Sequence, residues 1–337
     1  MKLVVTGSNG FIGQNTCRRL IDLGHQVIGV DDLSEGSSRR PVNGVRYHVR
    51  CVTDTEWLRR LFREIRPSAV IHLAAVPRVS YSVQEPLRSA TPNLTGTISV
   101  LNAMLKAGLV GESRLVFASS SSVYGGADTL PTPETHPCNP QSPYALTKLQ
   151  GEQWCRMFHR LYGLDVVSLR YFNVFGPGAR FGGAYSTVLP AWLHHLYVDP
   201  SYQPYLEGDG TQTRDFCFVD NVVQANVAAA VRNHGFSAEV LNIGQGQAHS
   251  LIQLQQALEQ ISGRKLPLER RPPRTADVAH TQADISQARA ELDFNPTIDF
   301  RDELSRTAAW YRERRPAPAR PAGPAAQAGG AGPHRKR

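Results

Sequence analysis

The chain has 337 residues, of which 41% are hydrophobic and 20% charged, as in ordinary globular proteins of one or two domains. Its formal net charge of +8 would suit a nucleic-acid binder, but residues 316–337 carry Arg320, Arg335, Lys336 and Arg337 and no acid. That tail supplies +4 of the +8, which leaves +4 on the other 315 residues. We expect this basic Pro/Ala/Gly-rich tail to be disordered, and we expect no specific nucleic-acid partner.

The five cysteines are scattered along the chain, and no pair has the spacing of metal ligands. Free thiols in a reducing compartment are the simplest interpretation, with no metal site. The strand-like segment KLVVT begins at residue 2, so no signal peptide is expected, and no apolar run is long enough to cross a bilayer. We therefore expect a cytoplasmic protein without membrane contact.

The first half of the chain alternates short apolar runs with helical patterns. KLVVT ends at Gly7, residues 11–23 have helical spacing, and the next strand, HQVIGV, ends at Asp31. Further strands are predicted at VRYHV, AVIHLAA, RLVFAS and VVSLRYF, with helices near 54–65, 93–107 and 142–162. This alternation predicts an α/β fold, with a Rossmann-like, doubly wound parallel sheet over residues 1–175.

After Gly176 the pattern becomes irregular, with prolines, glycines and aromatic residues crowding positions 176–216. Helices are predicted near 187–198, over SLIQLQQALEQISG and near 301–314, and a strand over AEVLNIG. We predict that 176–315 is mainly a smaller α/β substrate-binding domain, with the chain returning to the first sheet around 217–243.

A glycine-rich segment, TGSNGFIG, places Gly7, Gly10 and Gly13 between the first strand and the first helix. Glycines there allow a tight turn and let backbone N–H groups approach a pyrophosphate at the helix N-terminus. Asp31 ends the second strand about 20 residues later, where a carboxylate accepts hydrogen bonds from ribose hydroxyls. Because that carboxylate repels a 2′-phosphate, NAD is favoured over NADP.

A second motif, SPYALTK, places Tyr144 and Lys148 four residues apart. Ser142 is a suitable N-cap and Pro143 a suitable first helical residue, so both side chains are predicted on one face of a helix, one turn apart. Taken alone, this pair is more often an ordinary surface Tyr and Lys, and its meaning depends on the rest of the chain.

Together, TGSNGFIG, HLAA, SSSSVYG, SPYALTK and LRYFNVFGP resemble the extended short-chain dehydrogenase/reductase family. Within that family, residues 1–314 are most similar to the UDP-hexose 4-epimerases, and GDGTQTRDFCFVDNVVQAN resembles the branch that acts on UDP-N-acetylhexosamines. The resemblance implies that UDP-glucose and UDP-galactose, and also UDP-GlcNAc and UDP-GalNAc, are interconverted through a 4-keto sugar with tightly bound NAD. It also implies a homodimer.

The resemblance implies a catalytic set of Ser120, Tyr144 and Lys148, in which Tyr144 is the base, Ser120 bridges it to the substrate hydroxyl and Lys148 holds the nicotinamide ribose. A free phenol has a pKa of about 10, so a base working near neutral pH needs the phenolate to be stabilised. Lys148 and the positive nicotinamide ring are the two cations expected to do this.

The resemblance further implies two sets of contacts. Those to the cofactor are Gly7, Gly10, Phe11, Ile12, Gly13, Asp31, Ser34, Val52, Leu73, Ala74, Asn93, Tyr144, Lys148 and Tyr171. Those to the substrate are Ser82, Ser120, Asn173, Val188, Tyr205, Arg214, Arg274, Asp277 and Thr281, where the two arginines would hold the diphosphate. Thr281 occupies the position that gates the sugar pocket in these epimerases, where a small residue leaves room for an acetamido group.

Three alternatives remain open. The first is another nucleotide-sugar enzyme of the same fold, such as a 4,6-dehydratase, a uronate epimerase or a decarboxylase. Dehydratases place an Asp-Glu pair before the V-Y-G and decarboxylases a Glu, whereas this chain has Ser121 and Ser122, which argues against elimination. The second is a non-catalytic NAD sensor, against which the intact Ser, Tyr and Lys set argues. The third is a nucleic-acid binder that uses the basic tail.

Overall fold

A computed structural model describes residues 1–34, 41–182, 187–273, 278–296 and 299–313. Its centre is a seven-stranded sheet in the order β11-β6-β5-β4-β1-β2-β3, and all six strand pairs are parallel. The strands are β1 (Lys2–Thr6), β2 (Gln26–Asp31), β3 (Arg46–Val49), β4 (Ala69–His72), β5 (Arg114–Ser120), β6 (Asp165–Tyr171) and β11 (Ser237–Ile243). The predicted Rossmann-like, doubly wound fold is thereby confirmed.

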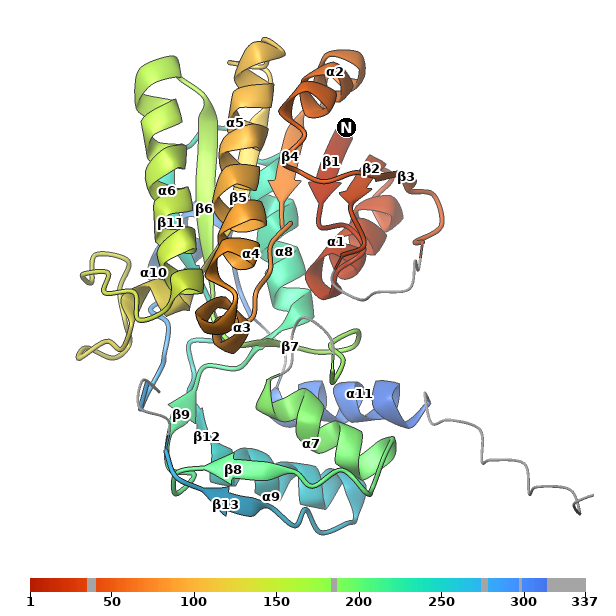
Figure 1. The fold of residues 1–337 in the computed structure, drawn as a ribbon, viewed down its shortest axis with the longest axis vertical. Helices are drawn as coiled ribbons and strands as arrows, with labels where there is room; N and C mark the ends of the chain where they lie inside the picture. The colour runs from red at the N-terminus through yellow and green to blue at the C-terminus, as the bar shows by residue number, and fades with distance from the viewer. Residues whose placement is uncertain (35–40, 183–186, 274–277, 297–298, 314–337) are drawn as a thin grey trace, which may run out of the picture.

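Helices cover both faces of the sheet (Figure 1). One face is packed by α1 (Phe11–Asp22), α8 (Val219–Val231) and α10 (Ser286–Leu292), and the other by α2 (Thr55–Ile65), α5 (Gly96–Lys106) and α6 (Pro143–Tyr162). The central strands are apolar on both faces because each face is covered; in β4, for example, all four residues are buried. After β1 the chain adds β2 and β3 on one side of the sheet, and then β4, β5 and β6 on the other, so the strand order reverses between β1 and β4. Ligands bind in the crevice at the carboxyl ends of strands beside such a reversal.

A smaller lobe lies below the carboxyl ends of the strands (Figure 1). It contains α7 (Val188–Tyr197), α9 (Leu251–Ser262) and α11 (Phe300–Arg312), which pack around a separate apolar cluster that includes the fully buried Trp192. Its short strand pairs are β8 (Tyr205–Glu207) with β13 (Glu269–Arg271) and β9 (Thr213–Arg214) with β12 (His249–Ser250). β7 (Val174–Phe175) and β10 (Cys217–Phe218) join the two lobes.

Several elements lie outside the sequence expectations. The expected helix near 93–107 is preceded by α3 (Val79–Gln84), α4 (Pro86–Ala90) and a π-helical turn, η1 (Thr91–Thr95). α8 shows no clear amphipathic pattern because it is buried on most sides, between α1 and the sheet. The segment of α10 returns to the sheet beside β11 and α8, where Ile285 and Ala288 join the apolar cluster on that face.

Candidate active site

The glycine-rich turn connects β1 to α1 through close backbone contacts. Gly7 has a φ of +67°, which side chains other than that of glycine rarely allow, and a Cβ on Gly13 would lie 2.0 Å from the Gly7 carbonyl oxygen. Gly10 is the N-cap of α1, and no side chain caps this end or places an acid in its first turn. The first N–H groups of α1 therefore point toward a position that suits a phosphate.

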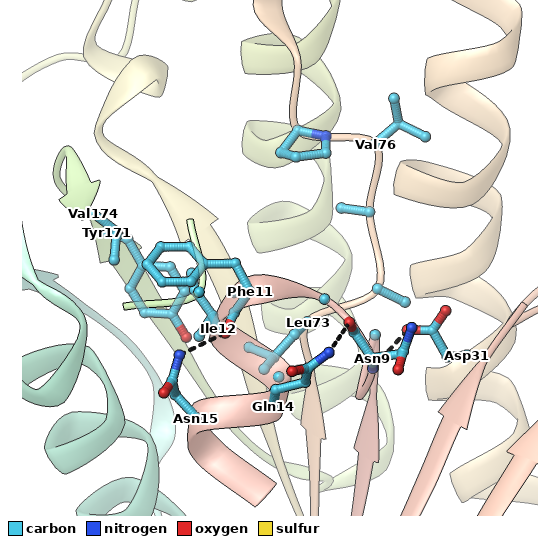
Figure 2. Close-up of a pocket in the computed structure, with 18 of the residues that line it drawn as sticks. Asn9, Phe11, Ile12, Gln14, Asn15, Asp31, Leu73, Val76, Tyr171 and Val174 are labelled. Carbon is cyan, nitrogen blue, oxygen red and sulfur yellow. Dashed lines mark hydrogen bonds between the residues drawn. The ribbon is translucent and has the colours of Figure 1, made fainter. Parts of the chain in front are cut away.

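Asp31 lies at the end of β2, beside this turn (Figure 2). Its Oδ2 accepts a hydrogen bond from the Asn9 N–H at 2.9 Å, and its Oδ1 accepts one from the Leu33 N–H at 2.9 Å. Burial raises the pKa of the Asp31 carboxyl, and these two amides offset part of the rise. The carboxylate is held rigidly at the place where the dinucleotide fold recognises ribose hydroxyls.

A cavity of about 730 Å³ runs from this turn past the ends of β4 and β5 to α6. It is large enough for a dinucleotide, and Gly7, Gly10 and Gly13 of the glycine-rich turn line it. Among the predicted residues, those that line it are Gly7, Gly10, Phe11, Ile12, Gly13, Asp31, Ser34, Val52, Leu73, Ala74, Ser120, Tyr144, Lys148 and Tyr171.

Asn93 is a predicted cofactor residue that the structure places behind the wall of this cavity. It is fully buried in η1, where its Oδ1 accepts from the Val76 N–H at 2.7 Å and its Nδ2 donates to the Val76 carbonyl at 3.1 Å. Val76 itself lines the cavity. Asn93 therefore fixes the loop after β4 from behind.

Several lining residues were absent from the predicted set. Asn15 on α1 donates to the Phe11 and Pro177 carbonyls at 2.9 and 3.1 Å, which joins the glycine turn to the segment after β7 (Figure 2 shows the first of these bonds). Arg180 and Trp310 bring the smaller lobe to the cavity, with the guanidinium 5.9 Å from the indole centroid. Trp310 lies in an amphipathic helix, a pattern that signals core packing and gives no indication of a cavity.

Tyr144 and Lys148 lie in the first two turns of α6, as the capping signals predict. Ser142 is the N-cap, and its Oγ accepts from the Ala145 N–H at 3.1 Å, while Pro143 occupies the first helical position. Lys148 Nζ donates to the Ala118 carbonyl at 2.7 Å and lies 5.9 Å from the centroid of the Tyr144 ring. Both side chains are buried and face the cavity.

Ser120, the last residue of β5, is the third member of the predicted catalytic set. A hydrogen bond from its side chain to the Tyr144 phenol lowers the pKa of Tyr144, but burial raises that pKa by more, to about 12. Burial also lowers the pKa of the Lys148 ammonium to about 8. The expected stabilisation of the phenolate by Lys148 is therefore not produced by the chain alone, because the ammonium is directed to the Ala118 carbonyl.

The structure brings three predicted substrate residues together outside the set that lines the cavity. Asn173 Nδ2 donates to Thr281 Oγ1 at 3.3 Å, although the two residues are 108 positions apart. Arg214 donates from Nη1 to the Thr213 carbonyl at 2.9 Å and to the Ala279 carbonyl at 3.3 Å, beside the Thr281 segment. This cluster joins β7, β9 and the chain near 280.

The remaining predicted substrate residues are more dispersed. Ser82 is fully buried beneath the start of α6, where its Oγ accepts from the Tyr144 N–H at 3.1 Å and donates to the Val79 carbonyl at 2.7 Å. Val188 is the first residue of α7, and Tyr205 lies on β8 with the Arg271 guanidinium 4.0 Å from its ring centroid. Arg274 and Asp277, like the tail 316–337, lie outside the described residues.

The described residues contain neither a metal-binding cluster nor a membrane-spanning helix. Within the residues that the structure describes, no group of three or more His, Cys, Asp and Glu side chains is arranged to hold a metal ion. Over the same residues, no helix combines the length and the apolar character that crossing a membrane requires.

Comparisons with known proteins agree with this geometry. A model of the NAD-dependent epimerase/dehydratase family matches residues 3–244. The UDP-glucuronate 4-epimerase of Thermodesulfobacterium geofontis is 32% identical over 321 residues, which cover 92% of this chain and 96% of that protein.

Two solved structures are also similar over almost the whole chain. The UDP-glucose 4-epimerase of Thermotoga maritima, solved with UDP-glucose, superposes with a TM-score of 0.85 at 33% identity and covers 93% of this chain and 99% of its own. The UDP-N-acetylglucosamine 4-epimerase of Methanobrevibacter ruminantium, solved with UDP-N-acetylmuramic acid, gives a TM-score of 0.84 at 30% identity, with 93% and 98% covered.

Proposed function

Because the chain belongs to the NAD-dependent epimerase/dehydratase family, we propose that it interconverts the C4 epimers of UDP-hexoses, both UDP-glucose with UDP-galactose and UDP-N-acetylglucosamine with UDP-N-acetylgalactosamine. At the coarser level the protein is an NAD-dependent nucleotide-sugar 4-epimerase, an isomerase. The finer statement, which names the sugars, rests on the site.

The observation that carries the proposal is the type of residue around Ser120. The positions after it are Ser121 and Ser122, and Ser122 Oγ lies 2.9 Å from Ser120 Oγ. Among the described residues, the carboxylates that line the cavity are Asp31, Asp32 and Glu313. The first two follow β2, which β1 and β4 separate from β5, and Glu313 follows α11. No carboxylate among them adjoins Ser120 to serve water elimination, so a hydroxyl and a phenol are left to move one proton.

In this proposal Tyr144, bridged by Ser120, takes the proton of the sugar 4-hydroxyl and later returns it. The cavity would hold NAD, whose chemistry is reversible acceptance of a hydride from C4, so the reaction would have no net redox change. Lys148 would hold the nicotinamide ribose, and the first turn of α1 the pyrophosphate. Arg214 would anchor the substrate diphosphate, while the freed 4-keto sugar turns to present its other face.

The smaller lobe, mainly residues 176–315, is proposed to bind the nucleotide sugar. Asn173, Arg214 and Thr281 meet where this lobe faces the end of the sheet, and Arg274 and Asp277 remain predicted contributors. Tyr205 and Val188, an aromatic and an apolar residue in the same lobe, are proposed to contact the uracil base of the substrate. The Ser82 hydroxyl both accepts a hydrogen bond and donates one, so we propose that Ser82 helps to position Tyr144 and does not contact the substrate directly.

A direct experiment tests the proposal. Purified protein is incubated separately with UDP-glucose, UDP-N-acetylglucosamine and UDP-glucuronate, and the sugar nucleotides are separated by chromatography. We expect epimer mixtures from the first two. Epimerisation of UDP-glucuronate alone would replace the proposed substrates with a uronate, and a 4-keto-6-deoxy product would replace the reaction with dehydration.

We also propose a homodimer that works in the cytoplasm. Leu146, Trp154, Met157 and Leu161 are 39–60% exposed and recur at helical spacing along α6. A stripe of this kind on a surface helix is typical of a protein–protein interface. All five cysteines are free thiols, which suits a reducing compartment.

A further inference from the structure

Asp215 is a buried carboxylate that neither the catalytic set nor the predicted substrate contacts include. Its side chain is fully buried at the end of β9. Three backbone amides donate to it: Gln245 at 2.7 Å to Oδ1, and Gly246 and Ala283 at 3.0 Å each to Oδ2. Main-chain amides from two other segments thus satisfy its charge.

The same residue also holds the substrate cluster through its own main chain. Its N–H donates to Thr281 Oγ1 at 3.2 Å, and its carbonyl accepts from Asn173 Nδ2 at 3.3 Å. Four stretches of chain therefore meet at Asp215: the turn after β6, β9 itself, the loop after β11 and residues 281–283. Three of the four carry a residue proposed to contact substrate.

The packing around the carboxylate is tight enough to require glycine. A Cβ added at Gly244 would lie 2.7 Å from Asp215 Oδ2 and 2.7 Å from the Ala283 Cβ. The loop after β11 therefore approaches the carboxylate as closely as backbone allows. Such an arrangement fixes the relative positions of the segments that it joins.

We infer that Asp215 is a positioning residue for nucleotide-sugar binding, which holds Thr281 and Asn173 in place beside Arg214. This inference rests on the proposed function, since it assigns these three residues to the substrate. The inference concerns substrate binding and not the catalytic pair. Tyr144 and Lys148 are held by α6 and β5, to which Asp215 makes no hydrogen bond among the described residues.

The state of the carboxyl group gives the inference a pH signature. Burial raises the pKa of Asp215 to about 6, and the three amides offset part of the rise. Among the described residues, the ionisable side chains near these contacts along the chain are Arg214, Cys217, His280 and Asp284. Below about pH 6 the protonated carboxyl loses acceptor capacity toward the amides, so the cluster loosens as the pH falls through that value.

The test compares Asp215→Asn with the wild type. The amide has the same shape, but its Nδ2 is a donor and must face at least one backbone N–H that the carboxylate accepted. We expect the KM for UDP-glucose and its dissociation constant to rise about tenfold or more, while kcat changes less than about threefold and bound NAD is unchanged. A fall in kcat at constant KM would overturn the inference.

The pH dependence of KM distinguishes this role from a purely structural one, because a purely structural role would not depend on the charge of Asp215. In the wild type, KM should rise as the pH falls from about 7 to about 5, and this rise should be absent in Asp215→Asn. His280→Gln removes the nearby imidazole and should leave the rise in place. Loss of the rise in His280→Gln alone would assign it to the imidazole and contradict the inference.

Two further variants keep the result interpretable. Asp209→Asn is the matched control, because Asp209 is an exposed carboxylate on the same stretch that accepts from Thr211 at 2.9 and 2.7 Å, and its KM should be unchanged. If Asp215→Asn does not fold, Thr281→Val removes the hydroxyl that joins Asp215 to Asn173, and KM should again rise selectively. Absence of wild-type turnover with all three sugars would defeat the proposed function, and UDP-glucose binding by the same variants would then still decide the inference.

Discussion

At the scale of single residues, Tyr144 is the group on which the proposed chemistry depends. Tyr144→Phe removes the proton acceptor and keeps the ring, so kcat for epimerisation should fall by about 10²- to 10⁴-fold, the usual contribution of a general base. NAD content and melting temperature should stay close to wild type, because the phenyl ring still fills the buried site. Tyr162→Phe, at the exposed end of the same helix, is the matched control and should retain full turnover.

Thr281 gives a second prediction at this scale, which concerns the sugar. Its side chain is half-buried beside Asn173, where a tyrosine would fill the space proposed for the acetamido group. Overpacking a fitted site costs about 1–3 kcal/mol. Thr281→Tyr should therefore lower kcat/KM for UDP-N-acetylglucosamine roughly five- to 150-fold more than for UDP-glucose.

The measurement for Thr281 is the ratio of the two kcat/KM values in each protein. Thr281→Ser keeps a small side chain with a hydroxyl and should preserve the ratio. Because Thr281 also accepts from the Asp215 N–H, an equal loss on both substrates is expected from any disturbance of the cluster. Only a change in the ratio of the two kcat/KM values supports the proposal that Thr281 leaves room for the acetamido group.

How far the sequence predicts a residue depends on where its partners lie along the chain. Tyr144 and Lys148 could be placed because their helix, its cap and their common face are all encoded within seven residues. The role of Asp215 could not, because its amide donors lie 30 to 68 positions away and become neighbours only in the folded chain. Lys148 shows a further limit: its position was predicted, but the direction of its ammonium depends on the Ala118 carbonyl.

At the scale of elements, α11 contains a buried carboxyl group at its contact with α8. Glu303 is fully buried, and neither of its carboxylate oxygens makes a hydrogen bond of standard geometry to a described residue. Burial raises the pKa of Glu303 to about 8, and Asp299 adds to the rise, whereas Arg306 and Asn221 oppose it. The folded chain therefore keeps this proton at pH values where the unfolded chain has released it.

This pKa shift predicts a pH-dependent stability. The cost of deprotonation begins as the pH rises above about 4.5 and is complete above about 8, so Glu303 destabilises the folded state at high pH. Glu303→Gln cannot ionise, and it should raise the free energy of unfolding at pH 8.5 by at least about 1 kcal/mol, the equivalent of one pKa unit. At pH 5 the gain should be much smaller.

Thermal unfolding at the two pH values checks this prediction. Asp302→Asn is the control, because Asp302 is the exposed neighbour on the same helix, and such surface changes stay within about 0.5 kcal/mol. Equal gains at pH 5 and pH 8.5 would show that Glu303 does not titrate in the fold.

Helices could be predicted from the sequence where apolar residues recur on one face and polar residues cover the other. α2 has its buried residues on one side and a capping Asp54, and its bounds agree with the expected 54–65. α8 has buried residues all round, so it carries no helical period, and α3 and α4 are too short to show one.

At the scale of the whole molecule, the doubly wound parallel sheet could be predicted because strands alternate with helices along the first half of the chain. The meeting of the two lobes could not, because it is made by side chains of distant segments, such as the Tyr311 hydroxyl, which donates to the Ala179 carbonyl at 2.7 Å. Quaternary structure is a further step, for which the surface gives the clue.

The surface that we assign to the dimer is the exposed apolar stripe of α6, continued by Val83 on α3 and Leu87 on α4, which are 63% and 80% exposed. These short helices pack against α6, so Val83 and Leu87 lie on elements next to the stripe, and we assign them to this patch (Figure 1 shows the three helices together). A second copy that places its own stripe on this patch would bury apolar surface from both chains, which contributes about 25 cal/mol per Å².

Light scattering coupled to gel filtration should therefore give twice the mass of one chain for the wild type. The double variant Trp154→Glu, Leu161→Glu places two charges on the stripe of each copy and should elute as a monomer, because burying unpaired charges is costly. Leu23→Glu introduces the same side chain at an exposed leucine after α1, away from α6, and should remain dimeric. A wild type that is already monomeric would contradict the homodimer, and a double variant that stays dimeric would place the contact between copies elsewhere.

Retained NAD in the monomeric variant would show in addition that one chain holds the cofactor by itself, as expected for a cavity lined by residues of a single chain.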